Sequence, residues 1–393
     1  MNRSGKPMVY LDSSDINSWG AMSQELGKNP LQYCPEFPKI ALRHEAFWEQ
    51  DLVDRPLFIA YADTNMKRSI DSRVGLLNQP DIWFEEKKKD LEQCRVLGDA
   101  LPHIQLSLGP MPLANIWGGH RQINGDTIWT HAFINDEWTN APDWQLGKSS
   151  EIWTQYLALL AKIVSDARGR YLIVAPDWGV AGDLIATMRG TSETCIDIMQ
   201  YPEKIKEAVD SIYPVWLRAF RETYDIALSA GVGVCQWLKL WSNKPYAICG
   251  CDISSLLGVE HFKEFFLPDI ARQAQMIGRA IYHLDGPSAI RHLDAILEVP
   301  EIRAIQYSPP PPDFSALPWI DVYKKIQDRG RSILLFCPPE EVLALSEALN
   351  PAGLGFVCRN PRKAEEDSES TVYSPISPET LEPILDGLSR QFL

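Results

Sequence analysis

The chain has 393 residues, of which 45% are hydrophobic and 23% are charged, as expected for a globular protein with a full core. A net charge of −14 leaves no basic face of the kind that binds nucleic acid, and no apolar run is long enough to predict a membrane span. Residues 1–15 lack the apolar stretch of a secretory signal, so we expect a cytoplasmic protein. Eight cysteines without a CxxC pair indicate buried thiols or a few metal ligands rather than disulfides.

Residues 1–54 are predicted to form an N-terminal extension that packs on the main domain as an arm or a lid. The extension is irregular in pattern, apart from a short helical segment over residues 42–51. Residues 55–393 are predicted to form a single large domain, because no long linker, low-complexity block or internal repeat interrupts them.

Within this domain, short apolar segments alternate with longer amphipathic segments such as 149–167, 201–230 and 260–278. Strands that alternate with helices at this spacing predict a parallel sheet with helical crossovers, and eight of them predict a closed (β/α)₈ TIM barrel. The eight predicted strands are 57–62, 127–133, 171–175, 237–241, 280–285, 303–308, 332–336 and 353–357.

Polar residues follow several of the predicted strands directly. They lie in residues 177–182, in residues 249–255, and in the His-Leu-Asp-Gly sequence at 283–286. In a barrel, these segments all lie at the carboxyl ends of the strands, where the active sites of such enzymes are found. We therefore expect them to meet at one site.

Four segments of the chain resemble the uroporphyrinogen decarboxylase-like superfamily. Residues 176–209 are similar to its middle segment, with an Arg-Gly helix end and a Tyr-Pro-Glu helix start, and residues 251–273 carry a strand-end polar group and a Phe-x-x-Pro helix. Residues 281–309 and 337–358 resemble its last strands and helices. The resemblance covers about residues 55–390 and implies a barrel enzyme that is either a decarboxylase or a zinc-dependent methyl or alkyl transferase acting on thiols or corrinoids.

The chain departs from the family's patterns at two places. Arg55 is the only basic residue of the 54–65 segment, where the decarboxylases carry an arginine-rich loop for a substrate with many carboxylates. His283 and Asp285 stand where the methyltransferases have a His-x-Cys pair, with Cys358 in the place of their final cysteine. The second metal-ligand position is thus a carboxylate rather than a thiolate.

A metal site is predicted from His283, Asp285 and Cys358, with Cys251 as a fourth candidate ligand. Residues two apart on a strand point to the same side, and Zn²⁺ accepts nitrogen, oxygen and sulfur ligands while a catalytic site keeps one position open. The alternative is that Asp285 caps a helix whose first turn contains Pro287, and that Cys358 is a buried thiol.

Asp177 and Tyr307 are the predicted catalytic residues, because both follow or end predicted strands. Asp177 is a candidate general acid or base, and Tyr307 a hydrogen-bonding or stacking contact for the substrate. Their alternatives are a turn aspartate and a pocket-wall tyrosine. The predicted substrate-binding residues are Asp252, Trp178, Trp117 and Arg189.

The leading functional hypothesis is a metal-dependent, zinc-using transferase that moves a methyl or small alkyl group to or from a thiol or a corrinoid carried by a partner protein. The first alternative is a decarboxylase of a small acid or porphyrinogen-type substrate, with Arg55 and Arg189 as carboxylate-binding residues. The second is a barrel that binds a ligand without catalysis. A small-molecule substrate is common to all three, and any oligomeric state is compatible with the sequence.

Overall fold

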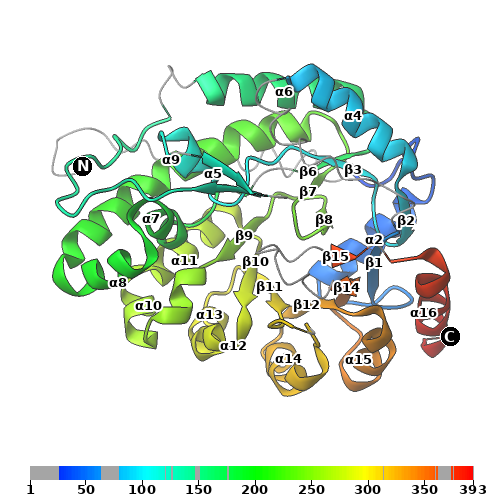
Figure 1. Cartoon of the computed structure of the whole chain (residues 1–393). Helices are drawn as coiled ribbons and strands as arrows, with labels where there is room; N and C mark the ends of the chain where they lie inside the picture. The colour runs from blue at the N-terminus through cyan, green and yellow to red at the C-terminus, as the bar shows by residue number, and fades with distance from the viewer. Residues whose placement is uncertain are drawn as a thin grey trace.

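The computed structural model describes residues 26–62, 79–119, 121–124, 127–146, 151–174, 177–312, 314–358, 360–361, 373–374 and 376–392. It is a mixed α/β structure, in which strands of two main sheets lie around the centre of the molecule and helices lie outside them (Figure 1). Among the described helices, none combines the length and the apolar character that crossing a membrane requires.

The larger sheet has seven strands, of which all but one are parallel. In chain order, these strands are β1 (Leu57–Ala62), β2 (Arg95–Gly98), β9 (Ala247–Gly250), β10 (Ala280–Asp285), β11 (Ile302–Ser308), β12 (Ser332–Cys337) and β13 (Leu354–Cys358). Their order across the sheet is β2-β1-β13-β12-β11-β10-β9, and only β2 runs antiparallel to its neighbour. The parallel strands are almost entirely buried and apolar, as is typical of strands covered by other elements on both faces.

The smaller sheet has four strands in the order β3-β6-β7-β8. They are β3 (His103–Gln105), β6 (Leu172–Val174), β7 (Val234–Cys235) and β8 (Trp241–Ser242). The first three are parallel, and β8 turns back against β7. Among the described residues, no strand pairing joins the two sheets, so the pairing shows an open, mostly parallel arrangement and does not show the predicted closed barrel.

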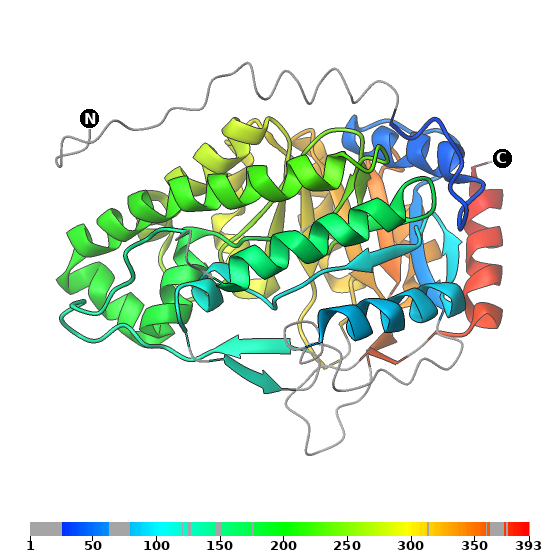
Figure 2. The ribbon, with the colours of Figure 1, turned by 90° about the horizontal axis from the view of Figure 1, so that it is seen from above.

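Two of the predicted strands have a different structure. Segment 127–133 supplies only β5 (Thr127–Thr130), which pairs with β4 (Arg121–Asn124) in a separate antiparallel hairpin that lies beyond the two sheets (Figure 2). Segment 237–241 mainly forms the turn between β7 and β8, where Lys239 has a φ of 65° that a strand does not allow.

Helices cover both sheets and connect the parallel strands. The longest is α9, which packs along α6 on one side of the molecule (Figure 2). Proline occupies the first turn of α4, α9 and α16, where its missing N–H costs no hydrogen bond. The helices are α2 (Phe37–Trp48), α4 (Pro80–Gln93), α5 (Pro112–Ile116), α6 (Glu151–Ala167), α7 (Ala181–Arg189), α8 (Thr191–Gln200), α9 (Pro202–Leu228), α10 (Val259–Phe265), α11 (Leu267–Ile277), α12 (Gly286–Ala289), α13 (Leu293–Leu297), α14 (Ile320–Asp328), α15 (Val342–Ala348) and α16 (Pro378–Gln391).

Short 3₁₀ turns and one small hairpin complete the described elements. The hairpin pairs β14 with β15. These elements are η1 (Asp252–Leu256), η2 (Ile290–His292), η3 (Leu317–Trp319), η4 (Pro339–Glu341), β14 (Asn360–Pro361) and β15 (Tyr373–Ser374).

A buried ionic cluster joins α2 to the strands. Asp99 is fully buried, and its carboxylate binds Arg55 at 2.6 Å and Arg43 of α2 at 3.0 Å. The same carboxylate accepts the backbone N–H of Phe58 in β1 at 2.9 Å. The helix that the sequence predicts over residues 42–51 thus begins earlier, at Phe37, and is anchored to the core of the domain by charge as well as by packing.

Asp99→Asn is expected to lower the free energy of unfolding by about 3–5 kcal/mol, because it leaves two buried guanidinium groups without their shared counter-ion. The measurement is chemical denaturation followed by circular dichroism. Asp54→Asn is the control, since Asp54 also binds Arg43 but its side chain is 44% exposed, and we expect a loss below about 1 kcal/mol there. Equal losses in the two variants would contradict the role assigned to Asp99.

Candidate metal and substrate site

A cavity of about 310 Å³ lies at the carboxyl ends of strands from both sheets. The smaller sheet and its connections contribute one wall, and the ends of β9 and β10 contribute another. This volume is at the lower end of the range for small-molecule sites, so it suits a small substrate. The lining residues used below are Asp177, Asp183, Trp237, Asp252 and His283.

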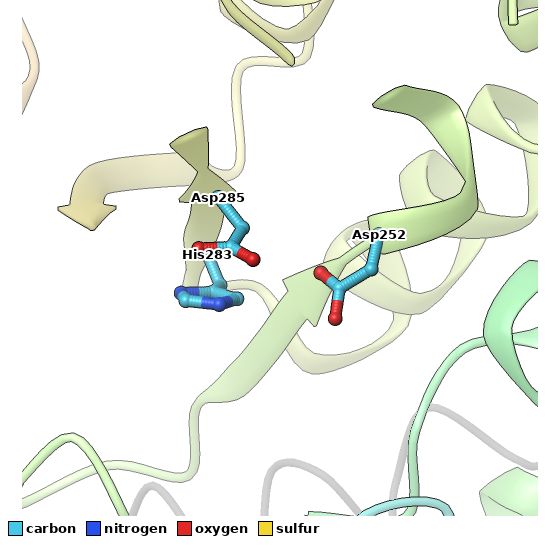
Figure 3. Close-up of side chains that lie close together, drawn as sticks. All are labelled: Asp252, His283 and Asp285. Carbon is cyan, nitrogen blue, oxygen red and sulfur yellow. The ribbon is translucent and has the colours of Figure 1, made fainter. Parts of the chain in front are cut away.

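Three side chains on the large-sheet wall form a cluster with the ligand types of a metal site. His283 and Asp285 lie two residues apart on β10 and therefore point to the same side of the sheet, while Asp252 is the first residue of η1, directly after β9 (Figure 3). One donor atom from each lies within 4.8 Å of the other two. One imidazole nitrogen and two carboxylate oxygens at this separation can coordinate a divalent metal ion.

The orientation of His283 is set by the neighbouring strand. Gln306 lies opposite His283 in the register of β10 and β11, and its carboxamide oxygen contacts Nδ1 of His283. The amide nitrogen of Gln306 donates to Oγ of Ser308 at 3.0 Å, which leaves its oxygen as the acceptor. The imidazole proton is therefore assigned to Nδ1, and Nε2 keeps the lone pair that a metal ion requires.

The position of Asp252 is set by a second buried carboxylate, that of Asp183 in the first turn of α7. Its two oxygens accept the backbone N–H groups of Asp252 and Ile253, each at 3.0 Å. Desolvation and the nearby charge of Asp252 raise the pKa of Asp183. Asp252 is open to the cavity, but the surrounding protein displaces much of the bulk water, and this desolvation raises its pKa as well.

Asp177 lies on the opposite wall, after β6. One of its oxygens accepts the indole N–H of Trp237 at 3.0 Å, and the other accepts the backbone N–H of Gly179 at 2.9 Å. Desolvation raises the pKa of Asp177, although both hydrogen bonds and the nearby His283 oppose the shift. The ring of Trp237 meets the His283 ring nearly at right angles, with 5.2 Å between the centroids, so the two walls touch here.

The two cysteines predicted as metal ligands lie outside the triad. Cys251 is buried against α7, where its sulfur lies close to Gly182, and Cys358 is buried at the end of β13, three strands from β10. Burial raises the pKa of both thiols, which opposes the thiolate form that a metal ion binds. The structure instead brings Asp252, predicted as a substrate contact, together with His283 and Asp285.

Two of the aromatic residues predicted for the site lie in the core. Tyr307 is fully buried, and its ring packs against Trp319 and Tyr323 on the helix side of β11, because it alternates with Gln306, which contacts His283. Trp178 is also buried and donates its indole N–H to Thr223 of α9 at 3.2 Å. Neither residue lines the cavity.

The remaining predicted contacts also lie away from the cavity. Trp117 packs edge-on against Trp144, with 5.4 Å between the ring centroids. Arg189 is buried and forms an ion pair with Asp197 at 2.8 Å. Arg55 belongs to the buried ionic cluster, where it binds Asp99. The arginines considered for a decarboxylase are thus already paired, and none of the lining residues is Lys or Arg.

Three residues of the site are not among the residues predicted from the sequence, namely Asp183, Trp237 and Gln306. Gln306 had a usable signal, since it is a polar residue in the middle of an otherwise apolar strand, and such a residue needs a partner. Residues 237–241 were predicted as a strand, so the sequence did not indicate that Trp237 lies in a turn.

No family model matches the chain, and no curated protein matches it. Among solved structures, the fold is similar to that of a methyltransferase from Methanosarcina mazei, with a TM-score of 0.56 and 11% sequence identity. The similarity covers 90% of this chain and 98% of that chain. At this identity, the likeness shows a shared fold.

Gln306→Leu is expected to weaken zinc binding by about 10–100-fold, because the His283 ring loses the acceptor that fixes its tautomer and orientation. Isothermal titration with Zn²⁺ measures this. Tyr307→Phe is the matched control, since it changes the next residue on the same strand and removes a hydroxyl that has no partner among the described residues. An equal loss of affinity in both variants would show that the strand, and not the Gln306 contact, is responsible.

Proposed function

We propose that this chain is a metal-dependent methyltransferase that moves a methyl or small alkyl group to or from a thiol. The observation that carries the proposal is the cluster of Asp252, His283 and Asp285 at the wall of a cavity at the strand ends. The similarity of the fold to a solved methyltransferase supports this choice of reaction.

The donor set fits zinc and other borderline divalent ions. The lone pair of His283 Nε2 and the two carboxylates supply three ligands, so a tetrahedral ion keeps one position for a thiol. A metal ion bound here would lower the pKa of that thiol and hold it as a nucleophilic thiolate. Two of the three candidate ligands are oxygens. Iron, cobalt and manganese ions are therefore further candidates beside zinc.

The residues of the chain would hold the reactants in line. Asp183 fixes the start of η1 and thus the position of Asp252, while Gln306 orients His283. Asp177 and Trp237 face these groups from the opposite wall. A small cavity with fixed walls would align the attacking sulfur with the methyl carbon, and such alignment is a large contribution that a protein makes to a displacement of this kind.

We further infer that the two sheets are two parts of one barrel, because the carboxyl ends of their strands meet at a single cavity. Membership of the uroporphyrinogen decarboxylase-like superfamily is part of the same proposal. A partner protein that carries a corrinoid is also part of the proposal, and only the sequence resemblance implies such a partner.

The two alternatives receive less support from the geometry. A decarboxylase of carboxylate-rich substrates needs basic side chains at the site, whereas the lining residues include three aspartates and no Lys or Arg. A non-catalytic barrel would be favoured by a site filled with side chains, but here a cavity is open beside the cluster.

The test is the metal content of the purified protein by plasma mass spectrometry, after incubation with zinc, cobalt or manganese and desalting. We expect about one ion per chain in the wild type and loss of the ion in His283→Ala and Asp252→Asn. Cys358→Ala is the control and should keep the ion, since its thiol lies outside the triad. Circular dichroism confirms that each variant is folded.

A wild type that holds no metal after incubation would overturn the proposal. Retention of metal in folded His283→Ala would overturn the assigned site. Loss of metal in Cys358→Ala would move the site toward the thiolate set that the sequence resemblance implies.

A further inference from the structure

The carboxylates of the cavity lack the cationic partners that the other buried aspartates have. Three buried aspartates elsewhere each form an ion pair with an arginine, and these are Asp99, Asp197 and Asp269. Asp183 is also buried, but among the described residues no Lys, Arg or His lies within ion-pair distance of it, and its hydrogen bonds come from backbone N–H groups. A buried carboxylate of this kind is most stable when a positive charge comes to it.

Asp177, on the same wall of the cavity as Asp183, also lacks an ion-pair partner among the described residues. Its two oxygens accept one hydrogen bond each, from Trp237 and Gly179. A divalent metal ion at the triad would be balanced by Asp252 and Asp285. The carboxyl groups of Asp177 and Asp183 would then remain for the substrate, and a cation bound beside them would favour their ionised form.

The chemistry of this wall selects a particular kind of cation. The carboxyl groups of Asp177 and Asp183 and the indole of Trp237 line the same cavity, so a cation bound there meets charge and an aromatic ring together. A methylated ammonium or sulfonium group offers charge and apolar methyl surface without hydrogen-bond donors, and such groups bind to aromatic rings and carboxylates. We propose that the cavity binds a positively charged methyl donor, a quaternary ammonium or a sulfonium group, on Asp177, Asp183 and Trp237. This inference rests on the proposed function and names its substrate class.

A second cavity gives room for the rest of such a donor. Its volume is about 500 Å³, and it shares Met111, Asp183 and Asp252 with the first. Thr187 and Thr191 add hydroxyl groups to its wall. The onium group would thus lie beside the triad, with its larger substituent directed into the second cavity.

The transfer step balances without a further reactant. The sulfur of a thiolate bound at the triad forms a bond to the methyl carbon, and the bond from carbon to the positively charged nitrogen or sulfur breaks. The electron pair of that bond goes to the leaving atom, which departs as a neutral amine or sulfide, and the thiol proton has already gone to solvent. The product loses the charge that attracts Asp177 and Asp183, so it is released more readily than the donor.

The first test compares choline with its neutral isostere 3,3-dimethyl-1-butanol by isothermal titration, using both zinc-loaded and metal-free protein. Choline is expected to bind at least about tenfold more tightly. Asp177→Asn and Asp183→Asn should each weaken choline binding by about tenfold, as should Trp237→Leu, which leaves the charges in place. Asp328→Asn is the matched control, because Asp328 is exposed at the end of α14. We expect this variant to bind choline with the affinity of the wild type.

The second test separates the two onium classes. Tetramethylammonium and trimethylsulfonium are supplied to the zinc-loaded protein with 2-mercaptoethanol, and the methylated thiol is measured by mass spectrometry. Transfer from one salt alone assigns the donor class. Equal binding of choline and its neutral isostere, or unchanged choline affinity in folded Asp177→Asn and Asp183→Asn, would overturn the inference.

The outcomes also separate this inference from the proposed function. Metal bound at the triad without onium binding overturns the inference alone. Onium binding by a protein that takes up no metal supports the donor site and overturns the metal-dependent reaction.

Discussion

The candidate site depends on one buried interaction, the pair of hydrogen bonds from the backbone of Asp252 and Ile253 to the carboxylate of Asp183. Asp183 belongs to α7, which follows a strand of the smaller sheet, whereas Asp252 begins η1 after a strand of the larger sheet. The two bonds therefore connect the sheets at the point where no strand pairing is seen among the described residues. Such charge-assisted bonds in a desolvated place are stronger than ordinary ones, so they can set the position of a ligand residue.

The elements that could be predicted from the sequence are those with long apolar runs. The strands at 57–62, 280–285 and 332–336 were found because each is a continuous apolar segment between helical patterns. In the smaller sheet, β6 lies within the predicted strand 171–175, whereas β3, β7 and β8 have only two or three residues each, which is too short for periodicity to detect. Segment 127–133 has the composition of a strand, but composition does not say which strand is its partner, and it pairs locally in a hairpin.

In the site, the sequence located the right segments but not which residue of each faces the cavity. His283 and Asp285 were predicted from their two-residue spacing, and the structure places them together. At two other places, the structure brings the neighbour of a predicted residue to the cluster. Asp252, which follows Cys251 and was predicted as a substrate contact, joins it, and Gln306, which precedes Tyr307, contacts His283 from β11. Because side chains alternate along a strand, a shift of one residue exchanges the cavity for the core.

The division of the cavity between the two sheets has a consequence for how such a site can change over time. The candidate metal ligands all follow or end strands of the larger sheet, whereas Asp177 and Trp237 follow strands of the smaller one. Under the proposed function, the connections after β6 and β7 could therefore diverge to accept a different substrate while the candidate ligands stay intact. Selection acting on the smaller sheet's connections would then alter which compound is bound, and selection on the larger sheet's strand ends would alter whether a metal ion is bound at all.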